Sequence, residues 1–239
     1  IWESVADAVP EHVALIQGER RISWRDYENR AARLAQGLID AGLGQNSKVG
    51  MYLYNSPEYA ETNFAAMKIS GVPINVNYRY LDDELHYLLE NADIEALVFH
   101  SSLGDRVARV CDRLPMLKAM ICVDDGPAED GSMGPANGIP YDTFLSQASG
   151  AAKTQPQGDE IYMLYTGGTT GMPKGVMYPL DGFTEFFMRG FPPMIGLPPF
   201  EDAAQFGPAA RQMVDANTTV VAMSGPPLMH GTGCWLGLM

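Results

Sequence analysis

The chain has 239 residues, 46% of them hydrophobic and 10% aromatic, which is enough apolar material to bury the core of a soluble globular protein. It carries 29 acidic and 16 basic residues, so its net charge at pH 7 is −13. This charge excludes general attraction to nucleic acid or to anionic membranes, and an anionic ligand must be held by a local cluster of donors.

The cysteines and histidines form no recognisable ligand set. Cys111, Cys122 and Cys234 contain no CxxC pair, and the four histidines are scattered without HExxH spacing. This pattern argues against a disulfide framework and a protein metal cage, and it fits the reducing cytoplasm. No run of eighteen apolar residues predicts an integral membrane segment. Because the chain begins without Met and ends in the apolar run GCWLGLM, we expect it to be a fragment.

Strands and helices are predicted to alternate along the first half. Ser23 followed by Asp26 resembles a capping box, and the apolar positions after it predict a helix over residues 24–41. Pro57 marks the first turn of a helix that starts near residue 55 and stops by Gly71. The remaining predicted elements are strands at 48–54, 72–75, 96–100 and 119–123, and helices at 83–91 and 103–113. This alternation predicts an α/β fold in which helices flank a layered, mostly parallel sheet.

The second half is less regular. Residues 124–140 and 150–159 are expected to be loops around a short helix at 141–149. A buried strand at 161–165 leads into a Gly/Thr segment, and a strand at 175–178 leaves it. Residues 190–207 combine prolines and phenylalanines without a clear period, and no element is predicted there.

The Gly/Thr segment concentrates hydrogen-bond donors in nine positions. It contains Thr166, Gly167, Gly168, Thr169, Thr170, Gly171, Met172, Pro173 and Lys174. Glycines let backbone amides approach a phosphate, threonine hydroxyls add donors, and the lysine adds a positive charge. The segment matches neither the GxxxxGK[ST] pattern nor GxGxxG, which weakens a kinase, GTPase or dinucleotide-binding interpretation. We predict an exposed, mobile phosphate-binding loop between two strands.

The segment over residues 165–176, YTGGTTGMPKGV, resembles the signature of the adenylate-forming (AMP-binding) superfamily. The usual form of that signature is TSGTTGxPKG after an apolar strand. Gly167 stands where serine is commonest, which removes one hydroxyl but leaves the backbone donors. Residues 23–99 are similar to the amino-terminal half of acyl-CoA synthetases, and PPLMHGTG, residues 226–233, is similar to their acyl and adenylate segment. The resemblance implies that residues 1–239 are an incomplete amino-terminal AMP-binding domain, without the rest of the large domain and the carboxyl-terminal lid domain.

The resemblance also implies the chemistry. ATP would activate a carboxylic acid, fatty or bulky and hydrophobic, to an acyl-adenylate, and coenzyme A would then take the acyl group. Lys174 and His230 are the expected catalytic residues, and Thr166 is the expected contact to Mg²⁺. The expected nucleotide-binding residues are Thr166, Gly167, Gly168, Thr169, Thr170, Gly171, Lys174 and Gly231. Cys234 and Trp235 are candidates for gating the acyl chain.

Several alternatives stay open. The acyl group could pass to a carrier-protein phosphopantetheine or be oxidised as in luciferases, and the chain could be a non-catalytic nucleotide-binding module. The expected partners are the acid, ATP and coenzyme A, with no nucleic acid, and a homo-oligomer is left open. The sequence does not define the acid, and we expect the chain alone to be inactive.

Overall fold

A computed structural model describes residues 1–128, 131, 134–135, 137–166 and 171–238. Within these residues, one sheet has seven strands in the order β7-β6-β5-β3-β4-β8-β9. All neighbouring strands are parallel except the antiparallel pair β8 and β9. The strands are β3 (Lys48–Tyr52), β4 (Val72–Asn75), β5 (Ile94–His100), β6 (Ala119–Val123), β7 (Ile139–Pro140), β8 (Ile161–Thr166) and β9 (Lys174–Pro179).

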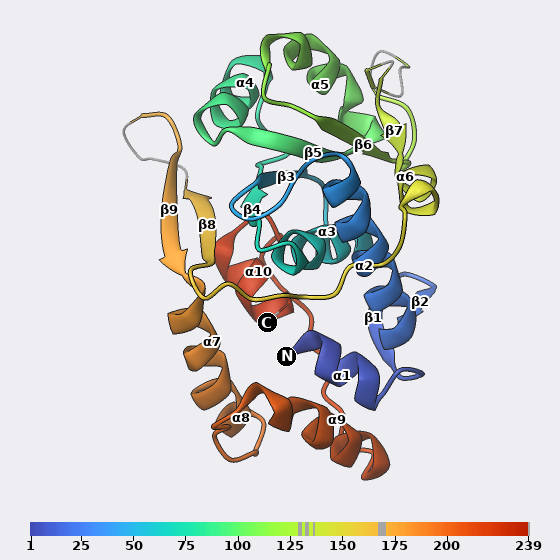
Figure 1. The fold of residues 1–239 in the computed structure, drawn as a ribbon, viewed down its shortest axis with the longest axis vertical. Coiled ribbons are helices and arrows are strands. Elements are labelled where there is room, and N and C mark those ends of the chain that lie inside the picture. Colours follow the sequence, from blue (N-terminus) through green and yellow to red (C-terminus); the bar gives the residue numbers. More distant parts are fainter. Residues whose placement is uncertain (129–130, 132–133, 136, 167–170, 239) are drawn as a thin grey trace.

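Helices cover both faces of the sheet, as Figure 1 shows. One face carries α2 (Trp24–Asp40), α3 (Pro57–Lys68) and α6 (Tyr141–Gln147), and the other carries α4 (Asp82–Asn91) and α5 (Gly104–Val110). Alternate strand residues enter the two cores: Met51 packs on the α2 and α3 side, whereas Tyr52 packs on the α4 and α5 side. This layering confirms the predicted α/β fold with a mostly parallel sheet.

At the predicted starts of α2 and α3, a serine side chain caps the first turn. Ser23 Oγ accepts from the backbone N–H of Asp26 at 3.1 Å, and Ser56 Oγ accepts from that of Tyr59 at 3.3 Å. These bonds satisfy amides that lack a partner in the first turn of a helix. Beyond the carboxyl end of α3, Gly71 leaves no room for a side chain, since an added Cβ would lie 2.9 Å from the carbonyl oxygen of Ser47.

The continuous helix predicted over residues 103–113 is wrong in detail. A 3₁₀ turn at Ser101–Leu103 precedes α5, and another at Cys111–Arg113 follows it. Asp125 accepts from the backbone N–H of Ser102 at 2.8 Å and from its hydroxyl at 2.7 Å. These bonds tie the first turn to the loop after β6, which accounts for the tighter geometry at this end.

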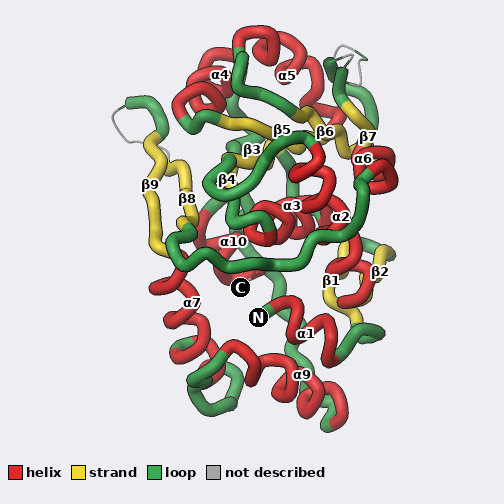
Figure 2. The backbone as a smooth tube through the Cα atoms, viewed as in Figure 1, coloured by secondary structure: helices red, strands yellow, loops and turns green. Residues whose placement is uncertain are grey.

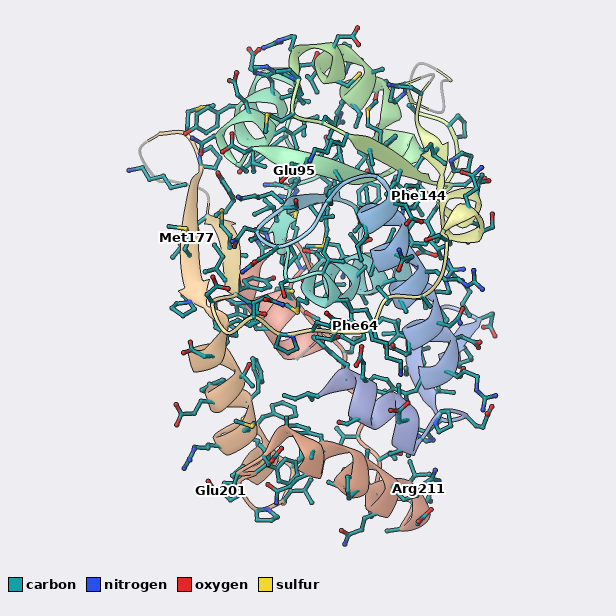
Figure 3. The ribbon with its side chains drawn as sticks, in the orientation of Figure 1. Phe64, Glu95, Phe144, Met177, Glu201 and Arg211 are labelled. Atoms are coloured by element: carbon teal, nitrogen blue, oxygen red, sulfur yellow. The ribbon has the colours of Figure 1, made fainter. Side chains whose placement is uncertain are left out.

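The amino-terminal region contains the helix that is apparent in the sequence from Ile1 onward, and a hairpin that was not predicted. Helix α1 (Trp2–Ala8) precedes an antiparallel hairpin of β1 (Val13–Gln17) and β2 (Arg20–Ser23). Gly18 turns this hairpin with φ +54°, a conformation that glycine adopts readily. Phe64 of α3, labelled in Figure 3, packs against Trp2 of α1, with ring centroids 4.6 Å apart.

The segment after β9 is largely helical, although no element was predicted for residues 190–207. It contains α7 (Leu180–Arg189), α8 (Phe191–Met194), a 3₁₀ turn (Ala203–Gln205), α9 (Phe206–Asp215) and α10 (Gly231–Leu238). Helices α7, α8 and α9 extend away from the sheet, whereas α10 returns beside β8 (Figure 1). Figure 2 shows the long loop between α6 and β8, which passes α2 and is held there by Ala152 N–H donating to Ala32 O at 2.9 Å.

Candidate functional site

The predicted phosphate loop sits at the tip of the β8–β9 hairpin. Thr166 and Lys174 are cross-strand partners at the open end of the ladder, and both are exposed. Gly171 is also exposed, while Gly167, Gly168, Thr169 and Thr170 lie outside the described residues. We refer to β8, β9 and the connecting residues as the phosphate-loop hairpin. Its described ends present one hydroxyl and one ammonium to solvent.

The base of the hairpin tip is packed closely. A Cβ added at Gly175 would lie 2.9 Å from Tyr165 Cε2, so glycine lets β9 approach the tyrosine ring. The Tyr165 hydroxyl donates to Asn91 Oδ1 of α4 at 2.8 Å. These contacts hold Tyr165, the residue directly before Thr166.

His230 lies at the start of α10 and is exposed. Its backbone N–H donates to Pro227 O at 3.0 Å, and its carbonyl accepts from the Cys234 N–H at 2.9 Å. Gly231 is buried, and any side chain there would overlap Leu164 of β8. We call residues 226–231 the His230 segment. It leads directly into α10 and packs on β8 through Gly231.

Asn75 brings the phosphate-loop hairpin and the His230 segment together. This residue ends β4 and is 5% exposed. Its Oδ1 accepts from the Tyr165 N–H at 2.8 Å, and its Nδ2 donates to Tyr165 O at 3.2 Å and to Met229 O at 2.6 Å. The residues bonded to this one amide directly precede Thr166 and His230. One side chain thus joins the residue before Thr166 to the residue before His230.

Two further polar side chains hold the His230 segment. The Tyr59 hydroxyl donates to Leu228 O at 2.9 Å, and the Leu228 N–H donates to Asn55 Oδ1 at 2.8 Å. Burial raises the pKa of Tyr59 well above its ordinary value, so its hydroxyl stays protonated and able to donate. Sequence reasoning assigned residues 55–59 and 72–75 to secondary structure alone and missed all three of these polar residues.

The two gating candidates both pack near Tyr162 in one core. Cys234 is fully buried, with Sγ 3.1 Å from the Tyr162 hydroxyl. Trp235 joins an aromatic cluster in which its ring centroid lies 4.9 Å from that of Phe183 and 5.5 Å from that of Tyr178. Helix α10 therefore runs from His230 at the loop end of the hairpin to Trp235 at the opposite end.

A cavity of about 730 Å³ opens at that opposite end. Glu160 and Leu180, which flank the hairpin on the side away from Thr166, line it. Its apolar wall is formed by Phe64, Met67, Phe183, Phe187, Met188 and Phe206. This cavity and Thr166 thus lie at opposite ends of β8.

Charge and metal ligands are sparse around the hairpin tip. Lys174 forms no salt bridge with any residue that the structure describes, so its charge is available to an anion. The described residues contain no group of three His, Cys, Asp or Glu side chains that could hold a metal ion. Thr166 provides one exposed hydroxyl, which fits Mg²⁺ only where phosphate oxygens and other ligands complete its shell. Among the described helices, none has the length and apolar character that a membrane crossing requires.

Known proteins are similar in sequence to this chain over almost its whole length. The sequence profile of "AMP-binding enzyme" matches residues 2–238. A medium/long-chain-fatty-acid–CoA/3-oxocholest-4-en-26-oate–CoA ligase of Mycolicibacterium smegmatis is 36% identical over 99% of this chain and 42% of its own length. A 3-oxocholest-4-en-26-oate–CoA ligase of Rhodococcus rhodochrous is 37% identical over 98% of this chain and 41% of its own length.

The fold is also found in solved structures. A putative long-chain-fatty-acid CoA ligase from Rhodopseudomonas palustris matches with a TM-score of 0.72 and 23% identity, over 99% of this chain and 53% of that one. The chain spans less than half the length of the two CoA ligases above. The match to the family profile is nevertheless almost complete, and the chain belongs to the AMP-binding enzyme family.

Proposed function

We propose that the whole protein containing this chain activates a carboxylic acid with ATP and transfers the acyl group to coenzyme A. The observation that carries this proposal is the meeting of the phosphate-loop hairpin and the His230 segment on Asn75. The chemistry requires two anions, a carboxylate and a triphosphate, to be held side by side. Both β4 and β8 end at this point, and ligands of open α/β sheets bind at the carboxyl ends of strands.

The reaction needs charge neutralisation more than a protein nucleophile. A carboxylate oxygen attacks the α-phosphorus of ATP, the bond from that phosphorus to the oxygen bridging the β-phosphate breaks, and pyrophosphate leaves with the electron pair. The thiol of coenzyme A then loses its proton and attacks the acyl carbonyl carbon, and AMP leaves. Preorganised donors stabilise the charge that moves onto each leaving group.

Each candidate residue has a role that its position supports. The ammonium of Lys174 and the amides of the phosphate loop would bind the phosphates, and Gly231 would bring its backbone close to the adenylate. His230, exposed at the start of α10, would position the reacting carboxylate beside the α-phosphate. Thr166 would contact Mg²⁺, which when bound supplies charge neutralisation to the phosphates.

A fatty or bulky hydrophobic acid is the substrate class that we propose. The names of the two CoA ligases above support it, since they specify fatty and steroid acids. The geometry of α10 supports it as well, because this helix leads from His230 toward the aromatic cluster that borders the apolar cavity. A cytoplasmic location is part of the proposal, because the sequence has three widely spaced cysteines and no CxxC pair.

Pyrophosphate exchange tests this function. The whole protein would be incubated with ATP, Mg²⁺ and labelled pyrophosphate across an acid panel from acetate through long fatty acids to aromatic and sterol side-chain acids. We expect exchange that depends on the acid and is fastest with the hydrophobic members. Binding of ATP without exchange on any acid would instead favour a non-catalytic nucleotide-binding module.

The acyl acceptor is tested separately. A protein named tyrocidine synthase 2, from Brevibacillus parabrevis, is 28% identical over 97% of this chain, which amounts to 6% of that protein. Similar segments therefore occur in proteins whose names do not mention coenzyme A. We expect acyl-CoA to form when coenzyme A is added to the exchanging enzyme. Exchange without acyl-CoA formation would favour a carrier-protein acceptor.

A further inference from the structure

Where β4 ends, the side chain of Asn75 makes the hydrogen bonds to β8 that backbone groups would make in a longer ladder. Ile74 pairs with Met163 in the parallel ladder between β4 and β8. At the next position, the amide of Asn75 binds both the N–H and the C=O of Tyr165, as a peptide group of a neighbouring strand would. Its second N–H is then free to bind Met229 O at 2.6 Å, a bond that joins a third segment to the first two.

An amide is the side chain that these three partners require. Two of the partners are carbonyl oxygens and one is an N–H, so the residue must both donate and accept. A carboxylate would accept from Tyr165 but would face the oxygens of Tyr165 and Met229 without a proton. An apolar residue would leave all three buried groups unpaired, which costs more than the bonds contribute.

We propose that Asn75 is a positioning residue for adenylation, which holds the phosphate-loop hairpin and the His230 segment at a fixed separation. This inference rests on the proposed function. Asn75 is 5% exposed, and it acts on the backbone next to Thr166 and His230 rather than on a substrate. Because reactive geometry depends on the relative placement of carboxylate and α-phosphorus, displacement of either segment slows the chemical step.

The test compares variants of the whole protein by pyrophosphate exchange. Asn75→Ser shortens the side chain so that it cannot reach all three partners. We expect kcat to fall about 100-fold, as a misplacement of about 1 Å can produce, while KM for ATP and KM for the acid each change less than about threefold. The matched control is Asn29→Ser on the exposed side of α2, which removes one hydrogen bond, from Arg33 at 3.3 Å, away from the phosphate-loop hairpin. This control is expected to keep the kinetics of the wild type.

The Asn75→Asp variant adds a second measurement, the pH dependence of the exchange rate, which a purely structural role would not change. Burial raises the pKa of a carboxyl group, and the protonated form can donate to Met229 O as the amide does. We expect the exchange rate of this variant, relative to the wild type at each pH, to recover as the pH falls from 8 to about 6. A ratio that stays constant over this range would count against the positioning role.

The outcomes separate this inference from the proposed function. A wild-type protein that exchanges with none of the acids would remove the proposed function and this inference with it. A wild-type protein that exchanges, together with an Asn75→Ser variant of unchanged kcat, would overturn the inference alone. Thermal unfolding of each variant is measured alongside. Failure of both Asn75 variants to fold would assign the residue to scaffold stability and would also overturn the positioning role.

Discussion

Lys174 is the cation of the phosphate loop, exposed at the first position of β9 and free of salt bridges to described residues. Its charge matters most as pyrophosphate leaves, when negative charge accumulates near the loop. Lys174→Ala in the whole protein should therefore lower kcat for exchange by about 100-fold, while KM for the acid stays within about twofold.

The matched control for this variant is Lys153→Ala. Lys153 is also exposed, but it lines a separate hollow between α1 and α2. Steady-state exchange kinetics of both variants provide the measurement. An exchange rate for Lys174→Ala equal to that of Lys153→Ala would remove the lysine from the site.

The site residues differ in how far the sequence could predict them. The loop residues and His230 could be proposed from the sequence because they lie in short contiguous segments with a recognisable pattern. Asn75 gives no such signal, since its partners Tyr165 and Met229 lie 90 and 154 residues away along the chain. A hydrogen bond of that kind exists only after the sheet has formed, and a local pattern cannot indicate it.

At the scale of elements, a buried cation joins three helices. Lys68 of α3 is 2% exposed, and its Nζ binds Glu28 of α2 at 2.7 Å and also Glu3 of α1. Removal of the lysine would leave two carboxylates facing each other in a partly buried site. We expect Lys68→Met to lower the free energy of unfolding by about 3–5 kcal/mol, as measured by urea denaturation.

The control for Lys68 is another lysine that forms a salt bridge. Lys118 binds Glu95 at 2.7 Å, but its side chain is 43% exposed. Solvent-exposed pairs contribute little, so Lys118→Met should change the free energy of unfolding by at most about 1 kcal/mol. Equal effects of the two substitutions would show that burial of Lys68 does not govern the stability of this helix junction.

The same cluster predicts a pH dependence. Desolvation raises the pKa of Glu3, but hydrogen bonds from Lys68 and Thr154 outweigh it and lower the pKa from 4.5 to about 2. A carboxyl whose pKa is lower in the folded state stabilises that state above its unfolded pKa and loses the effect as it becomes protonated. The stabilisation by Glu3 is therefore complete above about pH 5 and is lost between about pH 4.5 and 2.

Urea denaturation of wild type and Glu3→Gln at several pH values checks this expectation. The wild type should be the more stable protein at pH 7, and the difference should shrink as the pH falls below 4.5, the ordinary pKa of the glutamate. The pKa of Glu28 is shifted in the opposite direction, because desolvation raises it. The comparison is therefore made with the Glu3 variant alone. A difference that is independent of pH would contradict the role given to Glu3.

Sequence patterns predicted α2 and α3, which begin at serine caps, and missed α10, which depends on packing. Ser23 and Ser56 mark α2 and α3 clearly, and both capping bonds are present. Helix α10 has the sequence GTGCWLGL, whose glycines and continuous apolar character indicate no helical face. Its first turn fits because Gly231 packs on Leu164 and Gly233 packs on Pro226 and Pro227. Such tertiary contacts determine the helix and cannot be read from local composition.

At the scale of the whole molecule, we expect the chain alone to be catalytically inert. It spans 42% of the Mycolicibacterium smegmatis relative, and contacts to the phosphates alone do not orient the α-phosphorus toward a carboxylate. The purified chain would be incubated with ATP, Mg²⁺ and the acid panel, with the whole protein as the positive control. Exchange by the chain at the rate of the whole protein would show that the site has been misplaced.

The packing of α1 against α9 has a consequence for how the chain acquires its structure during synthesis. Arg211 of α9 donates to the carbonyl of Ala8, a partner 203 residues earlier, and Gly207 lets the two helices touch at Ser4. A ribosome that adds about 5–20 residues per second needs roughly 10–40 s to make the intervening chain. Trp2 can dock on Phe64 of α3 long before that, so α1 should first bind the nascent α2–α3 layer. Helix α9, which is synthesised later, would then pack on a surface that is already ordered.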